Sequence, residues 1–150
     1  AHTEALVAHM DFNAMNDKWT TQTLHDALAG HVGEHRQLAG LRLHKAPPSI
    51  GFRLSDYGDQ PVSITVSEDE VHISTPLCEQ RSVQHPDAFN EACLRLGPVM
   101  PLSNVGLVGN HYVLFGQISP HAPLANIVEE LDVLGQNATL AMGELSHLIG

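Results

Sequence analysis

The first predicted element is a helix with a capping signal in front of it. Apolar residues recur at four-residue spacing, at Leu24, Leu28 and Val32, as on one face of a helix. Thr20 stands before them as a predicted N-cap, and Trp19 is placed to pack on the first leucine as a hydrophobic staple. Because glycine commonly ends helices, we predict that this helix ends at Gly30 or Gly33.

The middle of the chain alternates apolar and polar residues, which is typical of strands with one solvated face. Between Leu38 and His44 the alternation is loose, and Pro47-Pro48 follows, so we predict no strand there. Three clearer segments are separated by turn residues and predict an antiparallel meander over 50–54, 62–66 and 71–74.

A short helix and a hairpin follow the meander. Pro86 and Asp87 are favoured at a helix start, and Gly97-Pro98 predicts its end. Two mostly apolar segments, 105–108 and 111–116, then flank a two-residue Gly109-Asn110 turn. This pattern predicts a β-hairpin, which we place at the centre of the sheet.

The last element is a long helix after Ser119-Pro120. Its apolar stripe consists of Leu124, Ile127, Val128, Leu131, Leu134, Ala138, Ala141, Leu145 and Leu148. Taken together, the elements predict an α+β fold with helices packed on a mostly antiparallel five-stranded sheet, in the order α-βββ-α-ββ-α.

Length and composition fit one globular domain. The chain has 150 residues, of which 43% are hydrophobic, enough to bury a core without disulfides or metal. The His9-Met10 pair is of the kind that cloning sites leave behind. We therefore set residues 1–17 apart as an N-terminal extension and predict a single domain over 18–150.

Charge and cysteine content exclude several classes of partner and location. Seven basic and 17 acidic residues give a formal net charge of −10, which repels nucleic acid and anionic membranes. Cys78 and Cys93 have no C-x-x-C spacing, which favours a reduced, cytoplasmic protein. No apolar run is long enough to cross a membrane and no signal segment opens the chain, so we expect neither membrane insertion nor export.

Motifs in the C-terminal half resemble those of a known family. They are Met100-Pro101-Leu102-Ser103-Asn104-Val105-Gly106, Tyr112-Val113-Leu114-Phe115-Gly116-Gln117-Ile118-Ser119, and Ile127-Val128-Glu129-Glu130-Leu131 with Leu134 and Asn137. The sequence resembles the YjfI-like proteins, a bacterial family of unknown function. By family association, the resemblance implies a partner of the membrane-stress coat-protein class, similar to phage-shock protein A.

The order of the elements is also similar to that of type III secretion chaperones. This second resemblance implies a cytoplasmic homodimer that binds partner segments on its sheet and helix surfaces. It concerns architecture, which is weak support for function. Neither resemblance implies catalytic residues.

One short motif points to zinc chemistry. His31-Val32-Gly33-Glu34-His35 matches H-x-x-E-H, in which two histidines one helical turn apart hold Zn²⁺ and the glutamate acts as base. A third ligand would have to come from Glu129, Glu130 or Glu144. The nearby glycines predict that the helix ends within the motif, and so short a match recurs by chance in a histidine-rich chain.

The other polar residues do not assemble a catalytic site. Seven further histidines are scattered without ligand spacing: His25, His44, His72, His85, His111, His121 and His147. Ser103 lies in a turn without a G-x-S-x-G elbow or an assigned base, so we interpret it as a turn residue. We predict no cofactor and no catalytic residue.

The end of the last helix is the predicted contact surface. Its apolar stripe is longer than one small sheet needs, and this end has less of its own domain to cover. The predicted partner or dimer residues are Ala138, Ala141, Met142, Leu145 and Leu148. The leading hypothesis is a non-catalytic, dimeric, protein-binding adaptor or chaperone-like protein. A zinc-dependent hydrolase and a small-molecule sensor with a pocket between sheet and helices are the alternatives.

Overall fold

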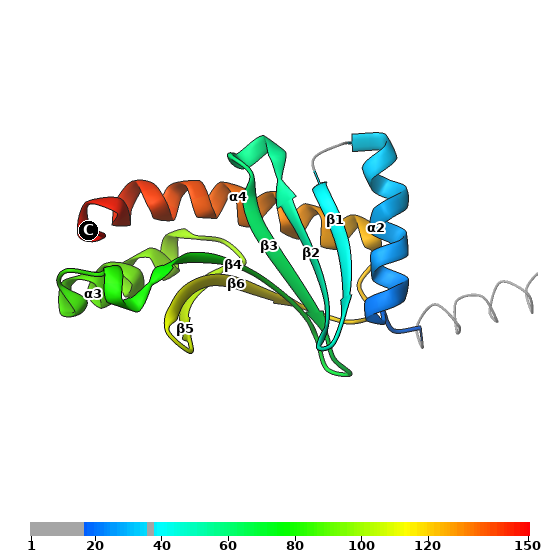
Figure 1. Cartoon of the computed structure of the whole chain (residues 1–150), viewed down its shortest axis with the longest axis horizontal. Helices are drawn as coiled ribbons and strands as arrows, with labels where there is room; N and C mark the ends of the chain where they lie inside the picture. The colour runs from blue at the N-terminus through cyan, green and yellow to red at the C-terminus, as the bar shows by residue number, and fades with distance from the viewer. Residues whose placement is uncertain (1–16, 36–37) are drawn as a thin grey trace, which may run out of the picture.

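The computed structural model describes residues 17–35 and 38–150, without the side chains of residues 32–35 (Figure 1). The predicted N-terminal extension therefore lies outside the described residues, apart from Asp17. The described chain forms three α-helices and six strands. In chain order they are α2 (Thr21–His35), β1 (Leu38–Lys45), β2 (Pro48–Leu54), β3 (Gln60–Val66), β4 (Val71–Glu79), α3 (Pro86–Leu96), β5 (Asn104–Val108), β6 (His111–Ile118) and α4 (Leu124–Leu145).

The six strands form one antiparallel sheet in the order β1-β2-β3-β4-β6-β5. The predicted meander and hairpin are both present, and the α+β fold is confirmed. The predicted central place of the hairpin is wrong, because β6 pairs with β4 and leaves β5 as an edge strand. After β4 the chain forms α3 outside the sheet and then returns to the sheet as the edge strand β5.

The predicted count of five strands is also wrong, because residues 38–45 form β1. This strand pairs with β2, and its register shifts between Ala39 and Arg42. Gly40 within the shift has a φ of 65°, a left-handed conformation that glycine adopts without steric cost. An irregularity of this kind breaks the two-residue period, which explains the loose alternation in the sequence.

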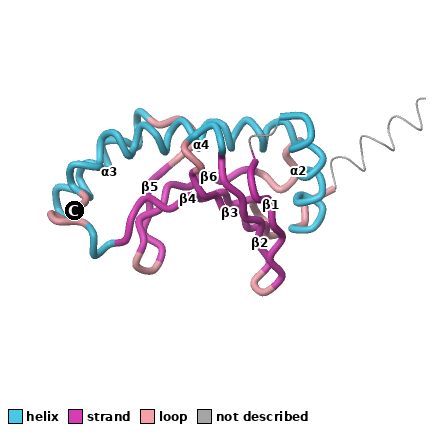
Figure 2. Tube along the Cα trace, turned by 45° about the horizontal axis from the view of Figure 1, so that its top comes forward, coloured by secondary structure: helices cyan, strands magenta, loops and turns pink. Residues whose placement is uncertain are grey.

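All three helices cover the same face of the sheet (Figure 2). The long α4 runs across the sheet, α2 packs on β1 and β2, and α3 contacts α4 and β5. The core lies between the two layers. Side chains that are fully buried there include Leu24, Leu28, Ile50, Leu54, Ile64, Ile73, Phe89, Leu114, Ile127, Leu131 and Leu145. Each such side chain stabilises the fold by about 1.5–3 kcal/mol relative to exposure.

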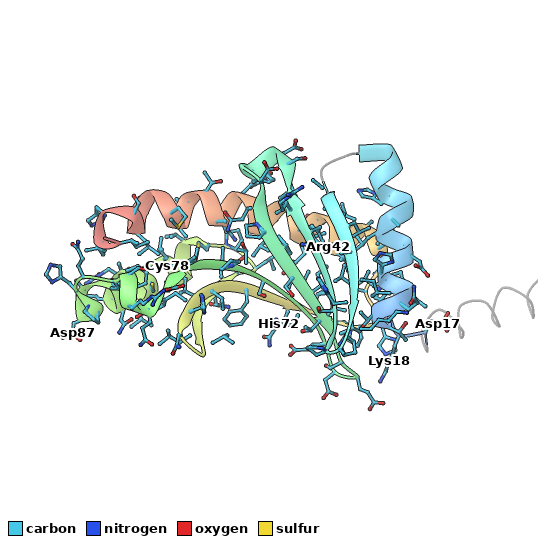
Figure 3. All side chains as sticks on the ribbon, viewed as in Figure 1. Asp17, Lys18, Arg42, His72, Cys78 and Asp87 are labelled. Atoms are coloured by element: carbon cyan, nitrogen blue, oxygen red, sulfur yellow. The ribbon has the colours of Figure 1, made fainter. Side chains whose placement is uncertain are left out.

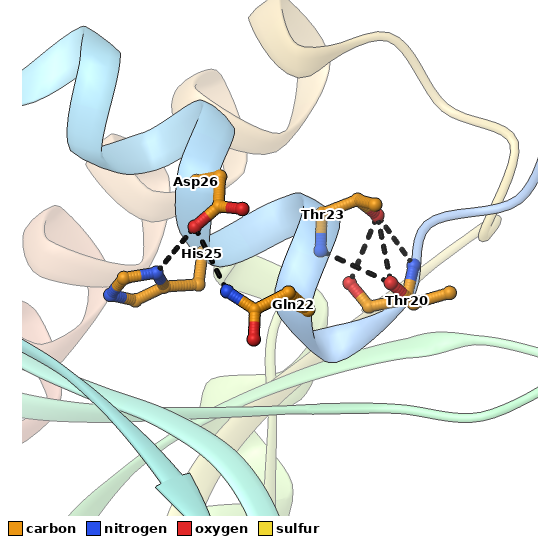
Figure 4. A network of polar contacts seen from close by, with 5 residues as sticks. All are labelled: Thr20, Gln22, Thr23, His25 and Asp26. Atoms are coloured by element: carbon orange, nitrogen blue, oxygen red, sulfur yellow. Dashed lines mark hydrogen bonds and ion pairs between the residues drawn. The ribbon is translucent and has the colours of Figure 1, made fainter.

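The start of α2 is capped as the sequence predicts (Figure 4). The backbone N–H of Thr23 donates to Thr20 Oγ1 at 3.1 Å, and the backbone N–H of Thr20 donates to Thr23 Oγ1 at 2.9 Å. The two bonds form a reciprocal box. The Trp19 indole N–H donates to the carbonyl oxygen of Ala122 at 2.7 Å. The residue before the cap therefore ties α2 to the segment that leads into α4.

The predicted end of α2 is wrong, because the helix continues through both glycines to His35. A glycine inside a helix costs about 1 kcal/mol relative to alanine. Leu24 and Leu28 are fully buried in the core, and such packing outweighs a local preference.

The last helix agrees with its predicted stripe. Ile127, Leu131, Leu134, Ala138, Ala141 and Leu145 are all buried. Gly135 lies on the same face against the ring of Tyr57, where a Cβ atom would overlap the ring. The Tyr57 hydroxyl donates to Asp132 Oδ1 at 2.5 Å, and this bond raises the pKa of Tyr57.

No helix in the described part of the chain is long and apolar enough to span a membrane.

Candidate protein-binding groove

A surface groove of about 550 Å³ lies between α3 and the C-terminal end of α4. We call it the α3–α4 groove. It is lined by Ala88, Glu91, Ala92, Arg95, Leu96, Val99, Leu140, Glu144, His147 and Leu148.

Small side chains on one helix and large apolar ones at the rim create the groove. Phe89 of α3 turns into the core and is fully buried, whereas Ala88 and Ala92 of the same helix line the groove. Val99 and Leu140 remain 63% and 40% exposed. The groove therefore presents apolar surface to solvent, as protein-binding sites do.

Charged side chains surround this apolar surface. Arg95 Nη2 donates to Glu91 Oε1 at 2.8 Å, one helical turn away on α3. Glu144 and His147 lie on the α4 side of the groove. Both members of the ion pair are exposed, so the pair adds little to stability. Apolar surface with charged side chains beside it fits an amphipathic protein segment.

The predicted contact surface on α4 is only partly available. Ala138, Ala141 and Leu145 are buried in the core of their own chain, so they cannot contact a partner without unfolding the helix from the sheet. Met142 and Leu148 are half-buried and pack against the core. Of the predicted residues, only Leu148 lines the groove. Their role in binding stays a prediction.

The contribution of α3 was missed by sequence reasoning. Ala88, Ala92 and Leu96 recur at four-residue spacing and form one face of α3, so their clustering could have been predicted. Their position opposite Leu140 of α4 depends on how the two helices pack. Nothing in the sequence pattern of either helix specifies that packing.

Ser103 has a structural role. It is buried, and its Oγ accepts a hydrogen bond of 2.8 Å from Asn137 Nδ2. The same amide group donates to the carbonyl oxygen of Pro101 at 2.7 Å. Asn137 of α4 thus anchors the segment before β5, and the interpretation of Ser103 as a structural residue agrees with these contacts.

The two cysteines have the properties of structural thiols. Cys78 lies near the end of β4 and Cys93 lies in α3, and both are free. Burial raises the pKa of both, that of Cys93 to about 11. A thiol with a raised pKa is mostly protonated at neutral pH and is a poor nucleophile. Nearby, the Tyr112 hydroxyl donates to Asn90 Oδ1 at 2.6 Å and so links β6 to α3.

The H-x-x-E-H segment is helical throughout, because α2 extends to His35. The sequence argument that the helix ends inside the motif is therefore wrong. The side chains of Glu34 and His35 lie outside the described residues. Among the side chains that are described, no group of three histidine, cysteine, aspartate or glutamate residues could hold a metal ion.

The other histidines are distributed over different elements. His25 Nδ1 and Asp26 Oδ1 are 3.1 Å apart at the start of α2, and hydrogen bonds with His25 and then Gln22 lower the pKa of Asp26 (Figure 4). His72 stacks on Phe115, with ring centroids 5.4 Å apart. His72 and Cys78 lie towards opposite ends of β4 (Figure 3).

Comparison with known families identifies this chain. Residues 18–148 match the family model described as an uncharacterized protein conserved in bacteria, DUF2170. The chain belongs to this family. The uncharacterized protein YjfI of Escherichia coli, in both strain K12 and O157:H7, is 34% identical to this chain over 100 residues. The match covers 64% of this chain and 74% of YjfI. The predicted YjfI-like resemblance is confirmed.

A solved structure supports the fold of this DUF2170 protein. The structure of this protein is similar to that of a chain of the heterodimeric ExoU–SpcU complex from the type III secretion system of Pseudomonas aeruginosa, with a TM-score of 0.52 and 15% identity. The match covers 69% of this chain and 88% of that chain. The predicted resemblance to a type III secretion chaperone fold is confirmed.

Proposed function

We propose that this protein is a non-catalytic, chaperone-like adaptor that binds an amphipathic segment of a protein partner in the α3–α4 groove. The observation that carries the proposal is the exposed apolar rim at Val99 and Leu140, set between charged residues. Together with Ala88 and Ala92 they form contiguous apolar surface, and contiguous apolar surface is a feature of protein-binding sites.

The comparisons support this proposal at the level of architecture. The similar solved chain comes from a heterodimeric protein complex, and a chaperone-like fold is suited to holding a partner segment. We further propose that the protein acts as a cytoplasmic homodimer. Its net charge of −10 disfavours nucleic acid as the partner. The family association suggests a membrane-stress coat protein as the partner class.

A capture experiment tests the groove. Leu140→Lys places a charge on the apolar rim, and Ala125→Lys places the same charge on an exposed position near the other end of α4. Each tagged protein is incubated with lysate of the native host, and bound proteins are quantified by mass spectrometry. A partner retained by the wild type and by Ala125→Lys should fall at least about tenfold with Leu140→Lys. Equal retention by all three proteins would contradict binding in the groove.

A zinc-dependent hydrolase is the second candidate, and the unbroken helix through His35 is the observation that favours it. The adaptor proposal predicts no stoichiometric zinc in protein purified without a polyhistidine tag. Metal content is measured for the wild type and for His31→Ala. One zinc per chain that is lost in the variant would replace the adaptor proposal with the hydrolase.

The small-molecule sensor alternative has no comparable support. The space between the sheet and α4 is occupied by fully buried side chains, among them Ile64, Leu114, Ile127 and Leu131. The α3–α4 groove instead opens at the surface between two helices. A protein segment therefore fits the observed surface better than an enclosed small molecule does.

A further inference from the structure

Acidic and basic residues are unevenly distributed over the fold. No described helix covers the second face of the sheet, which we call the outer face (Figure 2). Among the described acidic residues, Glu79 alone lies in a strand, at the end of β4, where it pairs with Arg81. The strands β1 and β2 contain Arg42, Lys45 and Arg53. A chain with a net charge of −10 therefore carries a basic patch on its sheet.

Two of these cations, Arg42 and Arg53, lie on the outer face. Ile50 and Phe52 of β2 are buried in the core, so the alternate residues Gly51 and Arg53 point the other way. Arg42 of β1 pairs with Gly51 and therefore shares its face. Both arginine side chains are exposed, so their charges are available to a ligand.

The two arginines line one hollow at the irregularity in β1. Arg53 extends from β2 towards the neighbouring strand, where a Cβ atom on Gly40 would lie 3.3 Å from Arg53 Nη2. Arg42 lines a hollow of about 240 Å³ together with Gly40, Leu41 and Arg53. The register shift of β1 therefore coincides with a small concave surface that contains two guanidinium groups.

Neither of these arginines pairs with a carboxylate in the described part of the chain, and the same holds for Lys45. The other described arginines, Arg81 and Arg95, each pair with a nearby glutamate. Charged residues on an edge strand commonly serve to keep that strand from pairing with other chains. This role does not account for Arg53, because β2 lies inside the sheet between β1 and β3.

We propose that Arg42 and Arg53 bind carboxylate side chains of an acidic segment of a protein partner. A guanidinium group can donate two parallel hydrogen bonds to one carboxylate, so two neighbouring arginines suit a segment with neighbouring acidic residues. The hollow of about 240 Å³ is smaller than typical small-molecule sites. This surface lies on the outer face, so the inference does not depend on the α3–α4 groove.

The length of the segment follows from the charge of the rest of the protein. Charges at a protein surface are screened over about 8 Å at physiological ionic strength. A short acidic segment therefore interacts mainly with the local arginines. A long polyanion or an anionic membrane extends over the acidic remainder of the chain and is repelled by it.

Fluorescence anisotropy of the full chain with a labelled hexaglutamate peptide at low salt tests the site. The wild type should bind the peptide saturably, and Arg42→Glu and Arg53→Glu should each raise the Kd by about tenfold or more. Arg81→Glu makes the same change of charge at an exposed position after β4 and should leave the Kd within about twofold. No saturable binding, or an equal rise of the Kd with Arg81→Glu, would overturn the proposal.

Nuclear magnetic resonance of the wild type locates the peptide even if a variant does not fold. Backbone amide signals of residues 40–44 and 51–53 should shift during the titration with hexaglutamate, and shifts confined to other elements would refute the site. Two competitors identify the anion. Stronger binding to phosphatidylserine vesicles than to the peptide would replace the acidic segment with a membrane surface. Displacement of the peptide by inorganic phosphate, but not by free glutamate at equal ionic strength, would replace it with a phosphate ligand.

Discussion

Two glycines of α4 differ in what a methyl group would meet. A Cβ atom at Gly135 would overlap the ring of Tyr57, whereas nothing lies within 4 Å of one at Gly143. Gly135→Ala should therefore lower the free energy of unfolding by about 1–3 kcal/mol through overpacking. Gly143→Ala should raise it by up to about 1 kcal/mol, because alanine is the better helix former. Urea unfolding measures both, and equal effects of the two changes would contradict the packing of Tyr57 on α4.

Glu130 is a buried carboxyl on the core side of α4. Burial, and to a smaller extent the charge of Glu129, raises its pKa above the ordinary 4.5. The folded protein therefore binds the proton of the Glu130 carboxyl more tightly than the unfolded chain does. This difference stabilises the folded state below pH 4.5, and the stabilisation is lost as the pH rises through the raised pKa.

Glu130→Gln should remove this pH dependence. The stability of the variant relative to the wild type should increase from pH 4.5 to neutral pH. The measurement is the free energy of unfolding in urea across that range. Glu68→Gln, at an exposed position in the turn between β3 and β4, is the control. Parallel curves for wild type and Glu130→Gln would show that burial does not shift this carboxyl.

At the scale of elements, the cap of α2 is the feature most directly encoded in the sequence. Thr20 accepts from the N–H of Thr23, so Thr20→Ala should destabilise the protein by about 1 kcal/mol. Thr139→Ala, on an exposed position inside α4, is the matched control and should be neutral or slightly stabilising. Thermal unfolding compares the two, and an unchanged midpoint for Thr20→Ala would contradict the cap.

Elements with regular patterns were predictable from the sequence. The bounds of α3 follow from Pro86 and the Gly97-Pro98 pair, and the β5–β6 hairpin follows from its two-residue turn. One strand, β1, and the C-terminal end of α2 were predicted wrongly, because tertiary contacts override the local signals there. The shift at Gly40 disturbs the period of β1, and packing of α2 on the sheet carries that helix past its glycines.

At the scale of the whole molecule, the strand order and the packing of the helices could not be predicted from the sequence. A hairpin pattern does not say which of its strands faces solvent, so β5 was placed at the centre when it lies at the edge. For the same reason the predicted contact surface includes three residues that lie in the core, Ala138, Ala141 and Leu145, and its role in binding stays a prediction. The groove exists only because Leu140 of α4 and Ala92 of α3 lie across from each other.

Site-specific photocrosslinking tests the central claim that the α3–α4 groove holds a protein partner. A photoreactive amino acid replaces Leu140 at the rim of the groove, or Ala125 on the exposed surface of the same helix, in cells of the native host. We predict a discrete covalent adduct with another protein at position 140 that is absent at position 125. No adduct at position 140, or the same adducts at both positions, would contradict a protein-binding groove.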